Sequence, residues 1–247
     1  MKGEQDYQYP VEIGISMMNE NEALTPGAYQ QLAMQVVEPH LFNIEMDEQR
    51  LIGQYNVAWV LLSMSFELRR PIRPRERLCA RTWNSGGSRL LFRRELVFYD
   101  AQGALIMTGV TFSTLLDLGQ RRVCTDPEMI ARFALPAGEQ LMQASDRLRL
   151  KTPELDPVET LTVRPSWIDG VGHVNNCRYG EFLYDALTDA QRAQMAKLKR
   201  LELYFVNESK LGDQLALHRI DEPQGAIVTA SRPGAVRPSF TGKVVFE

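Results

Sequence analysis

The sequence predicts an α+β protein made of two copies of one unit, in which a long helix packs on a mostly antiparallel sheet. The first observation is a pair of amphipathic helices, whose residues Tyr29 and Tyr179 hold equivalent places 150 residues apart. The second is a series of segments in which apolar and polar residues alternate, as in strands with one buried face. The third is that each half has the same order of elements: a strand, a helix and then further strands. A helix that lies along the apolar face of such a sheet buries both surfaces.

The first half is expected to begin with a short strand at residues 7–18, followed by a polar loop. Thr25 and Pro26 are typical of a helix start, because threonine caps the first turn and proline lacks an N–H that would have no helical partner. Glu38-Pro39 predicts the end of this helix. Its apolar positions recur at helical spacing, and they are Tyr29, Leu32, Ala33, Val36 and Val37.

Four strands are expected after the first helix. The clearest is residues 57–68, in which every second residue from Ala58 to Leu68 is apolar. Gly86-Gly87 indicates a turn, because glycine adopts backbone conformations that other residues avoid. The remaining strands are residues 78–83, 90–99 and 104–116, and the last two form a hairpin.

Residues 126–157 separate the two halves. Four prolines punctuate this segment, which has no clear period apart from one turn of helix near residues 129–133. We interpret it as a linker. Residues 1–125 are therefore expected to form an N-terminal domain and residues 158–247 a C-terminal domain.

The second half repeats the pattern of the first. We expect a strand at residues 159–164, a helix whose apolar face begins at Tyr179, and a basic, loosely helical continuation at residues 192–200. At an offset of 150 residues, the apolar positions of the second helix fall on those of the first, and Asn175 falls on the cap Thr25. The matched cap and the matched strand order indicate an internal duplication. The last strands are expected at residues 201–206, 214–220, 226–231 and 240–246.

The composition is that of an ordinary globular protein, with 44% apolar and 24% charged residues in a chain of 247. A formal net charge of -3 argues against a dedicated nucleic-acid binder. The N-terminal segment has no apolar run of the signal-peptide kind, and no stretch reaches the roughly 20 apolar residues of a membrane helix. The three cysteines are too widely spaced to predict a metal cluster or a disulfide framework. We therefore expect a cytoplasmic protein without a metal site.

The loop before the second helix concentrates residues that can do chemistry. It places Asp169 and His173 directly before the helix, for which Asn175 and Asn176 are good N-caps. A helix N-terminus presents unpaired N–H groups and favours negative charge. A titratable pair at such a terminus predicts acyl-transfer chemistry, in which an oxyanion develops.

This loop resembles a motif of the hotdog-fold thioesterases. The motif is the string GHVNN from Gly172 to Asn176, followed after two further residues by Tyr179 and preceded by Asp169. The duplication and the segments WVLLSMSFELRRP, RTW and LELYFVNES are similar to a narrower group, the acyl-ACP thioesterases of bacteria and plant plastids. The resemblance spans nearly the whole chain. It implies a double hotdog, in which two tandem repeats, each a long helix wrapped by an antiparallel sheet, join into one continuous sheet.

The resemblance implies the hydrolysis of fatty acyl-ACP to a free fatty acid and holo-ACP, without a cofactor. It also implies that the C-terminal hotdog is catalytic, with Asp169, His173 and Glu208 as its catalytic residues. Two positions depart from the family pattern: Val171 stands where the family usually has asparagine, and Ser209 stands where many members have cysteine. The first change removes a side chain that polarises the substrate carbonyl. The second removes a thiol and so favours an activated water as nucleophile.

The first copy lacks the chemical groups of the second. At the offset of the helices, Ala23 and Asn19 take the places of the histidine and the aspartate. The aligned strands put Pro71 near the place of the glutamate. The N-terminal hotdog is therefore expected to bind the acyl chain without catalysing the reaction.

Our hypothesis gives Glu208 the role of general base toward water, and His173 that of a hydrogen-bonding residue or proton shuttle. Asp169 would fix the tautomer and the orientation of the histidine, as in other base–orienter pairs. The start of the second helix would stabilise the oxyanion. The residues expected to bind the substrate or the oxyanion are Asn175, Asn176, Val171 and Ser209.

Two other functions remain open at this point. The scaffold would suit an acyl-CoA thioesterase, although no glycine-rich phosphate cradle is visible. It would also suit an acyl-binding or sensory protein that has lost catalysis, which Val171 favours. Each candidate site residue could instead have an ordinary structural role, as a helix cap, a turn former or a solvated residue at a strand end. Cys177, next to the motif, would allow a mechanism with a thiolate as nucleophile.

The expected partner is acyl carrier protein, which is acidic in this family. Two basic clusters could steer it by long-range attraction. A monomer and a homodimer both fit, because the duplication already pairs two hotdogs. The clusters are Arg69, Arg70, Arg73, Arg75 and Arg77 in the first half, and Arg192, Lys197, Lys199 and Arg200 in the second.

Overall fold

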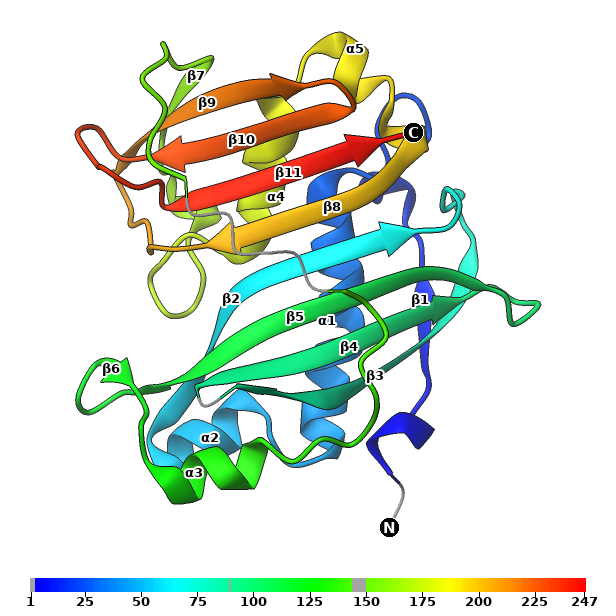
Figure 1. The fold of residues 1–247 in the computed structure, drawn as a ribbon, viewed down its shortest axis with the longest axis vertical. Helices are drawn as coiled ribbons and strands as arrows, with labels where there is room; N and C mark the ends of the chain where they lie inside the picture. The colour runs from blue at the N-terminus through cyan, green and yellow to red at the C-terminus, as the bar shows by residue number, and fades with distance from the viewer. Residues whose placement is uncertain (1–2, 89, 144–149) are drawn as a thin grey trace. The chain divides into compact units, whose positions relative to one another are not determined.

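The chain divides into two compact units (Figure 1). The computed structural model describes residues 3–88, 90–143 and 150–247. Unit 1 contains Met1–Glu12, Leu32–Met64 and Glu76–Ala144, and unit 2 contains Ile13–Gln31, Ser65–Arg75 and Ser145–Glu247. The first long helix and the strand that follows it therefore contribute to both units.

The described elements follow the order expected for two repeats. The helices are α1 (Pro26–Asn43), α2 (Glu48–Tyr55), α3 (Pro127–Phe133), α4 (Asn176–Asp185) and α5 (Asp189–Arg192). Short 3-10 turns lie at Glu4–Asp6, Ile15–Met17, Pro165–Trp167 and Met195–Lys197. The strands are β1 (Tyr9–Glu12), β2 (Val57–Leu68), β3 (Arg77–Ser88), β4 (Leu91–Tyr99), β5 (Leu105–Asp117), β6 (Arg122–Val123), β7 (Glu159–Thr162), β8 (Leu198–Phe205), β9 (Gln214–Glu222), β10 (Gly225–Ser231) and β11 (Phe240–Phe246). None of the described helices is long and apolar enough to cross a membrane.

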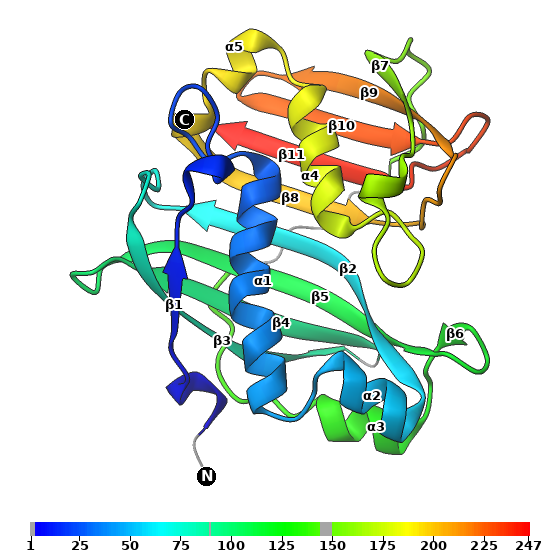
Figure 2. The ribbon, with the colours of Figure 1, turned by 180° about the vertical axis from the view of Figure 1, so that it is seen from behind.

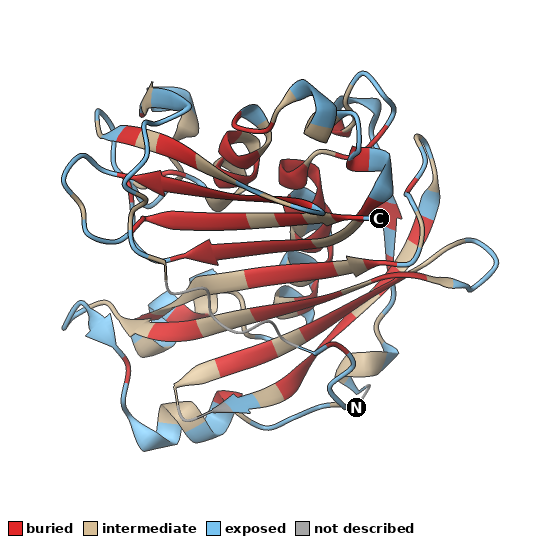
Figure 3. Cartoon of the chain, turned by 45° about the horizontal axis from the view of Figure 1, so that its top comes forward, coloured by how far each residue is buried: buried red, intermediate tan, exposed pale blue. Residues whose placement is uncertain are grey.

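One strand order is used twice. In hydrogen-bonding order the strands run β1-β3-β4-β5-β2-β8-β11-β10-β9-β7, with β6 beside β5. Read inward from its two ends, this order gives the series β1-β3-β4-β5-β2 and the equivalent series β7-β9-β10-β11-β8. Strand β2 passes from unit 1 into unit 2 after Met64. Buried residues run along the strands of each unit (Figure 3), so the predicted tandem repeat of helix and antiparallel sheet is confirmed.

From Leu32 onward, helix α1 belongs to unit 1 and lies along the face of the unit 1 sheet (Figure 2). Its predicted apolar face is buried, with Tyr29 and Leu32 at most 2% exposed. The predicted end at the proline is wrong, because the helix continues through Pro39 to Asn43. Proline removes only one helical hydrogen bond here. The fully buried side chain of His40 contacts β1 and holds the extra turn in place.

Helix α4 lies on the face of the unit 2 sheet (Figure 2). Asn175 is its N-cap, and the side-chain oxygen of this residue accepts a hydrogen bond from the N–H of Cys177 at 2.9 Å. The predicted apolar face is buried, with Tyr179, Phe182 and Leu183 at most 3% exposed. The sequence-based predictions of this cap and this face are confirmed.

The structure differs from the sequence-based prediction in further places. The strand expected at residues 7–18 is limited to β1, and a 3-10 turn follows at Ile15–Met17. Helix α2 was not predicted, although the side chain of Asp47 caps its start. Gly86-Gly87 lies within β3 as an irregularity of its pairing with β4 and does not form a turn. A Cβ on Gly87 would lie 1.9 Å from the carbonyl oxygen of Leu91, so this pairing requires glycine. Residues 192–200 contain the end of α5, a 3-10 turn and the start of β8.

The first part of the predicted linker is held on unit 1. Helix α3 forms at the predicted turn of helix and is capped by Asp126. After it, the carbonyl of Phe133 accepts a hydrogen bond from Nδ2 of Asn84 at 2.6 Å, and the carbonyl of Glu139 accepts one from Nε1 of Trp83 at 2.9 Å. These contacts attach a segment without sequence periodicity to the sheet.

Candidate active site

The loop before α4 is closed by its own hydrogen bonds. Ile168 and Val174 pair across it as an isolated antiparallel bridge. The Oδ1 atom of Asp169 accepts hydrogen bonds from the N–H groups of Val171 at 3.0 Å and His173 at 3.3 Å. The N–H of Asp169 donates to the carbonyl of His173 at 2.9 Å. The aspartate thus shapes the backbone that presents the histidine, and the hydrogen bonds of the described residues include none from it to the imidazole ring.

The first copy contains the same loop without the histidine. Met18 and Leu24 form the equivalent bridge, 150 residues earlier in the chain. The Oδ1 atom of Asn19 accepts hydrogen bonds from the N–H groups of Asn21 and Ala23, both at 3.0 Å. An amide therefore closes this loop as a carboxylate closes the other, so loop closure by itself needs no charge.

The ring of His173 lies beside the carboxylate of Glu208. The distance from Nε2 of the histidine to Oε2 of the glutamate is 2.9 Å. The side chains are 22% and 54% exposed, so water can reach the contact. The residues that follow them are also joined, because the N–H of Val174 donates to the carbonyl of Ser209 at 2.9 Å. The structure thus brings together two candidate catalytic residues from separate segments of unit 2.

Helix α4 begins directly after this loop and offers a free donor. The side-chain oxygen of Asn175 already accepts a hydrogen bond from the N–H of Cys177. The hydrogen bonds of the described residues leave the N–H of Asn176 without an acceptor. This N–H and the positive end of the helix dipole favour negative charge at the helix start.

The start of α4 also has a partner that the sequence did not reveal. The carbonyl of Asn176 accepts a hydrogen bond from Nε2 of Gln30 in α1 at 2.9 Å, and both residues belong to unit 2. Gln30 is only 1% exposed. The sequence could not indicate this contact, because the two residues are 146 positions apart and the polar residue stands on a helix next to apolar positions.

Two predicted substrate-binding residues lie in opposite surroundings. The side chain of Val171 is 62% exposed and carries no polar atom with which to polarise a carbonyl. Ser209 is 1% exposed, and its Oγ accepts a hydrogen bond from the hydroxyl of Tyr179 at 2.9 Å. Helical periodicity identifies Tyr179 as a buried position, but it does not reveal what the hydroxyl contacts.

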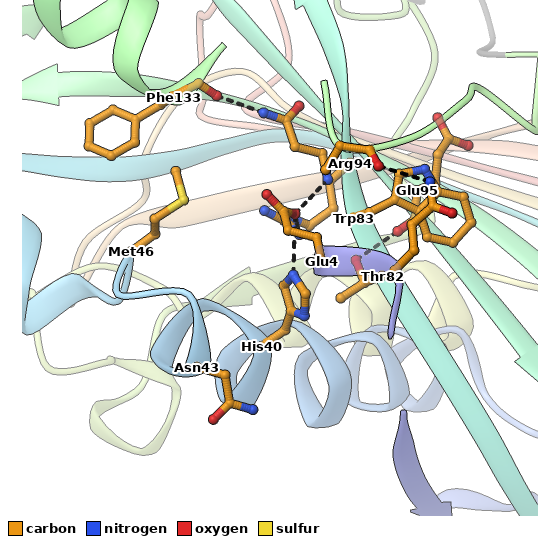
Figure 4. Close-up of polar contacts among 12 residues, drawn as sticks. Glu4, His40, Asn43, Met46, Thr82, Trp83, Arg94, Glu95 and Phe133 are labelled. Carbon is orange, nitrogen blue, oxygen red and sulfur yellow. Dashed lines mark hydrogen bonds and ion pairs between the residues drawn. The ribbon is translucent and has the colours of Figure 1, made fainter. Parts of the chain in front are cut away.

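Unit 1 contains a polar network of its own around the buried side chain of His40 (Figure 4). Glu4 lies between His40 and Arg94, with its Oε2 atom 3.3 Å from Nε2 of the histidine and 3.5 Å from Nη1 of the arginine. Nδ1 of His40 is 3.1 Å from the hydroxyl of Tyr9, to which Nδ2 of Asn43 donates at 3.1 Å. These groups satisfy one another, so we regard the network as structural.

Burial and the contacts within the network shift the pKa values of two of its titrating groups, His40 and Glu4. Burial lowers the pKa of His40, and the hydrogen bond with Glu4 offsets only part of the effect. Burial by itself raises the pKa of Glu4, but the hydrogen bond with His40 and the charge of Arg94 outweigh it and leave this pKa below its usual value. At neutral pH the network therefore holds a neutral imidazole between a hydroxyl and a carboxylate.

The chain is similar to solved structures over almost its whole length. An acyl-ACP thioesterase from Bacteroides thetaiotaomicron gives a TM-score of 0.84 at 23% identity, and the match covers 98% of this chain and 97% of the other. The 12:0-ACP thioesterase from Umbellularia californica gives a TM-score of 0.78 at 13% identity, with 98% and 96% covered. These similarities confirm the predicted α+β double hotdog. No curated protein sequence matches the chain.

Two family models match the sequence itself. The acyl-ACP thioesterase N-terminal domain matches residues 4–133, and the acyl-ACP thioesterase C-terminal domain matches residues 150–232. The fold and the two models define a tandem hotdog protein of the thioesterase class. The chain belongs to the acyl-ACP thioesterase family, and the predicted class of thioester hydrolase is confirmed.

Proposed function

We propose that the protein hydrolyses fatty acyl-ACP thioesters to free fatty acid and holo-ACP at the loop before α4. The observation that carries this proposal is the 2.9 Å contact between Nε2 of His173 and the carboxylate of Glu208. Membership of the acyl-ACP thioesterase family supports it. An acid–base pair that water can reach, next to a helix N-terminus, has the groups that thioester hydrolysis needs.

In this mechanism Glu208 acts as the general base. Its carboxylate takes a proton from a water molecule as the water oxygen attacks the thioester carbonyl, whose oxygen becomes an oxyanion. When the tetrahedral intermediate collapses, the C–S bond breaks and the carrier leaves as a thiolate. His173, in contact with Glu208, relays the proton to the sulfur. The acyl group has then gained the water oxygen, and the carrier has gained a proton.

The start of α4 supplies the stabilisation of the oxyanion. Among the hydrogen bonds of the described residues, none uses the N–H of Asn176, so this donor at the helix start is proposed to bind the oxyanion. The side-chain oxygen of Asn175 is already used as a cap, and Val171 has no donor in its side chain. A donor of this kind is worth about 3–4 kcal/mol where oxyanion holes have been measured.

Asp169 contributes to the site mainly through the backbone. It was expected to orient the imidazole of His173, and this role remains a prediction. The described hydrogen bonds favour a different role, because its Oδ1 atom binds the N–H groups of Val171 and His173. We therefore propose that Asp169 places the histidine by shaping the loop.

The carrier is proposed to approach the turn between β2 and β3. Arg69 and Arg75 on this turn are exposed. In the second basic cluster, by contrast, Arg192 pairs with Asp189 and Lys199 pairs with Glu247. Among the described residues no ion pair is seen for Arg69 or Arg75, and an arginine without such a pair attracts an acidic carrier more strongly than a paired one does. The N-terminal hotdog is proposed to bind the acyl chain.

The test is a hydrolysis assay over acyl-ACPs of several chain lengths. Glu208→Gln and His173→Gln are expected to lower kcat by about 10²–10⁴-fold, as removal of a general acid or base does, while the melting temperature stays near that of the wild type. Glu20→Gln, in the equivalent loop of the first copy, is the matched control and should keep the wild-type rate. Near-normal hydrolysis by both site variants would contradict the assignment.

A non-catalytic acyl-binding protein is the second candidate, and the apolar side chain of Val171 favours it. Under this alternative, acyl-ACP bound to the wild-type protein stays intact during prolonged incubation. The third possibility is an acyl-CoA thioesterase. To distinguish it from an acyl-ACP thioesterase, kcat/KM is compared for one acyl group carried by acyl carrier protein and by coenzyme A. Higher activity on coenzyme A would favour that carrier.

A further inference from the structure

One buried hydrogen bond is made by the residue that directly follows Glu208 of the proposed catalytic pair. The hydroxyl of Tyr179 in α4 donates to Oγ of Ser209 at 2.9 Å, and the two residues are 3% and 1% exposed. Ser209 was expected to bind the substrate, but its side chain is buried, which favours a different role.

Ser209 connects the two segments that carry the pair. It directly follows Glu208, and its carbonyl accepts a hydrogen bond from the N–H of Val174, which directly follows His173. The segment before Ser209 is exposed from residue 206 to residue 208. The position of the glutamate backbone therefore depends on how firmly Ser209 is anchored.

The ring of Tyr179 is a rigid anchor. It stacks on Phe240 with 5.0 Å between the ring centroids and meets Phe182 edge-on at 5.5 Å. Burial raises the pKa of the Tyr179 hydroxyl, so this group stays protonated and remains a donor. A buried hydrogen bond between a fixed donor and a fixed acceptor restricts the backbone that carries them.

The first copy lacks this bond. Strands β2 and β8 end at Leu68 and Phe205, and the same offset of 137 residues places Ile72 where Ser209 stands. Ile72 is 3% exposed and has no acceptor in its side chain. Tyr29 is the equivalent of Tyr179, so the tyrosine is present in both helices. The acceptor occurs only in the copy that contains the histidine and the glutamate, so the bond accompanies the site and not the fold.

We propose that Tyr179 and Ser209 are positioning residues, whose hydrogen bond holds the segment of Glu208 against the loop of His173. This proposal rests on the proposed hydrolysis. It predicts that the bond can be removed without unfolding the protein, because the tyrosine ring stays packed when only its hydroxyl is lost.

The kinetic test compares Tyr179→Phe, Ser209→Ala and the double variant with the wild type. Each single variant is expected to lower kcat by about 10–100-fold through misplacement of the base, with KM within about twofold, because the substrate contacts remain. The double variant should lose no more than either single one, since both remove the same bond. Ser209→Cys, which restores a weak acceptor, should recover part of the rate. Tyr29→Phe, at the equivalent position of the first copy, should keep the wild-type kcat.

A second readout does not depend on turnover. The chain has three histidines, so a ¹H–¹⁵N spectrum of the imidazoles is simple to assign, with His173→Gln identifying the signals of His173. In Tyr179→Phe and Ser209→Ala these signals are expected to move toward their positions in Glu208→Gln, while those of His40 and His218 stay unchanged. A purely structural bond would lower the melting temperature and leave both kcat and the His173 signals as in the wild type, which would overturn the proposal. A wild-type protein that hydrolyses no acyl-ACP would refute the proposed function, and the spectra would still decide whether the bond positions the pair.

Discussion

Asp169 and Asn19 close the two equivalent loops in the same way. Each accepts hydrogen bonds from two backbone N–H groups of its own loop, at distances of 3.0–3.3 Å. Only the second loop carries a histidine. The charge of Asp169 is therefore not required to form the loop, and its effect on the reaction can be separated from its effect on folding.

Asp169→Asn is expected to keep the melting temperature within about 2 °C of the wild type, because asparagine makes the same two bonds in the first copy. Asp169→Ala is expected to lower the free energy of unfolding by about 1–2 kcal/mol, because both N–H groups lose their acceptor. Urea unfolding measures both values. Asn19→Ala is the comparison in the first copy and should lose at least as much as Asp169→Ala, because Nδ2 of Asn19 also donates to the carbonyl of Arg192 at 3.4 Å. If the asparagine and alanine variants at position 169 were equally destabilised, the loop-closing role would be wrong.

At the scale of elements, the first turn of α1 meets α4 within unit 2 at two glycines. A Cβ on Gly180 would lie 2.6 Å from the backbone nitrogen of Gly27 and 2.3 Å from Oε1 of Gln30. Gln30 in turn binds the carbonyl of Asn176 at the start of α4. The absence of a side chain at position 180 therefore lets α1 support the helix end that the proposed reaction uses.

Gly180→Ala is expected to lower the free energy of unfolding by about 1–3 kcal/mol, because the added methyl group overlaps backbone that cannot move away easily. Gly53→Ala in α2 is the control, since an added Cβ there meets no atom within 4 Å. Alanine at this exposed helical position should stabilise the protein by about 0.5–1 kcal/mol. Chemical denaturation of the two variants gives the comparison. A gain in stability for both would contradict the close approach of α1 and α4.

At the scale of the whole molecule, the two copies of the repeat share their fold but differ in the polar groups that they contain. Both copies keep the strand order, the helix and the closed loop, but the histidine and the glutamate occur only in the second copy. The first copy instead contains a partly buried network of Glu4, His40 and Arg94, which joins the N-terminal segment to α1 and β4. We expect this network to make the stability of the chain depend on pH.

The free energy of unfolding is expected to decrease as the pH falls from about 7 to about 5. The pKa of His40 in the folded chain lies below its usual value of 6.5, so the unfolded chain takes up a proton at a higher pH than the folded chain does. Protonation below pH 6.5 therefore favours the unfolded state, until the lower folded-state pKa is reached. The lowered pKa of Glu4 adds a further loss below its usual value of 4.5.

Urea midpoints at about pH 7.5, 6.5 and 5.5 measure this dependence. His40→Gln should show a smaller decrease than the wild type, because glutamine does not titrate. Burial also lowers the pKa of His218, so His218→Gln is needed to separate the two histidines. An unchanged decrease in His40→Gln would show that the network around Glu4 does not set the pH dependence.

Much of the fold could be predicted from patterns along the chain. The cap at Asn175 and the apolar face of its helix follow from local sequence, and both are found in the structure. The end of α1 could not be predicted, because the contacts of His40 offset the cost of Pro39. The role of Gly87 could not be predicted either, because it depends on the backbone of the neighbouring strand, which lies too close to Gly87 for a side chain to fit.

The candidate site was predictable to a similar degree. His173 and the helix start are neighbours in the chain, so their proximity is a local property. The positions of the glutamate and of Ser209 are not local, because strand order and register decide which residues return to the loop. For the same reason, the bond from Tyr179 and the support from Gln30 could not be seen in the sequence.

The sequence by itself determined the duplication, the faces of the two long helices and the loop residues of the second copy, because each depends on periodicity or chemistry within a short stretch. Only the tertiary structure decided that Glu208 lies 2.9 Å from His173, that Asp169 bonds to backbone and that Ser209 is buried against Tyr179. Some of these contacts join segments that are far apart along the chain, and others are made by side chains that could have bonded to several different groups. Their formation depends on packing and strand register, which no local pattern encodes.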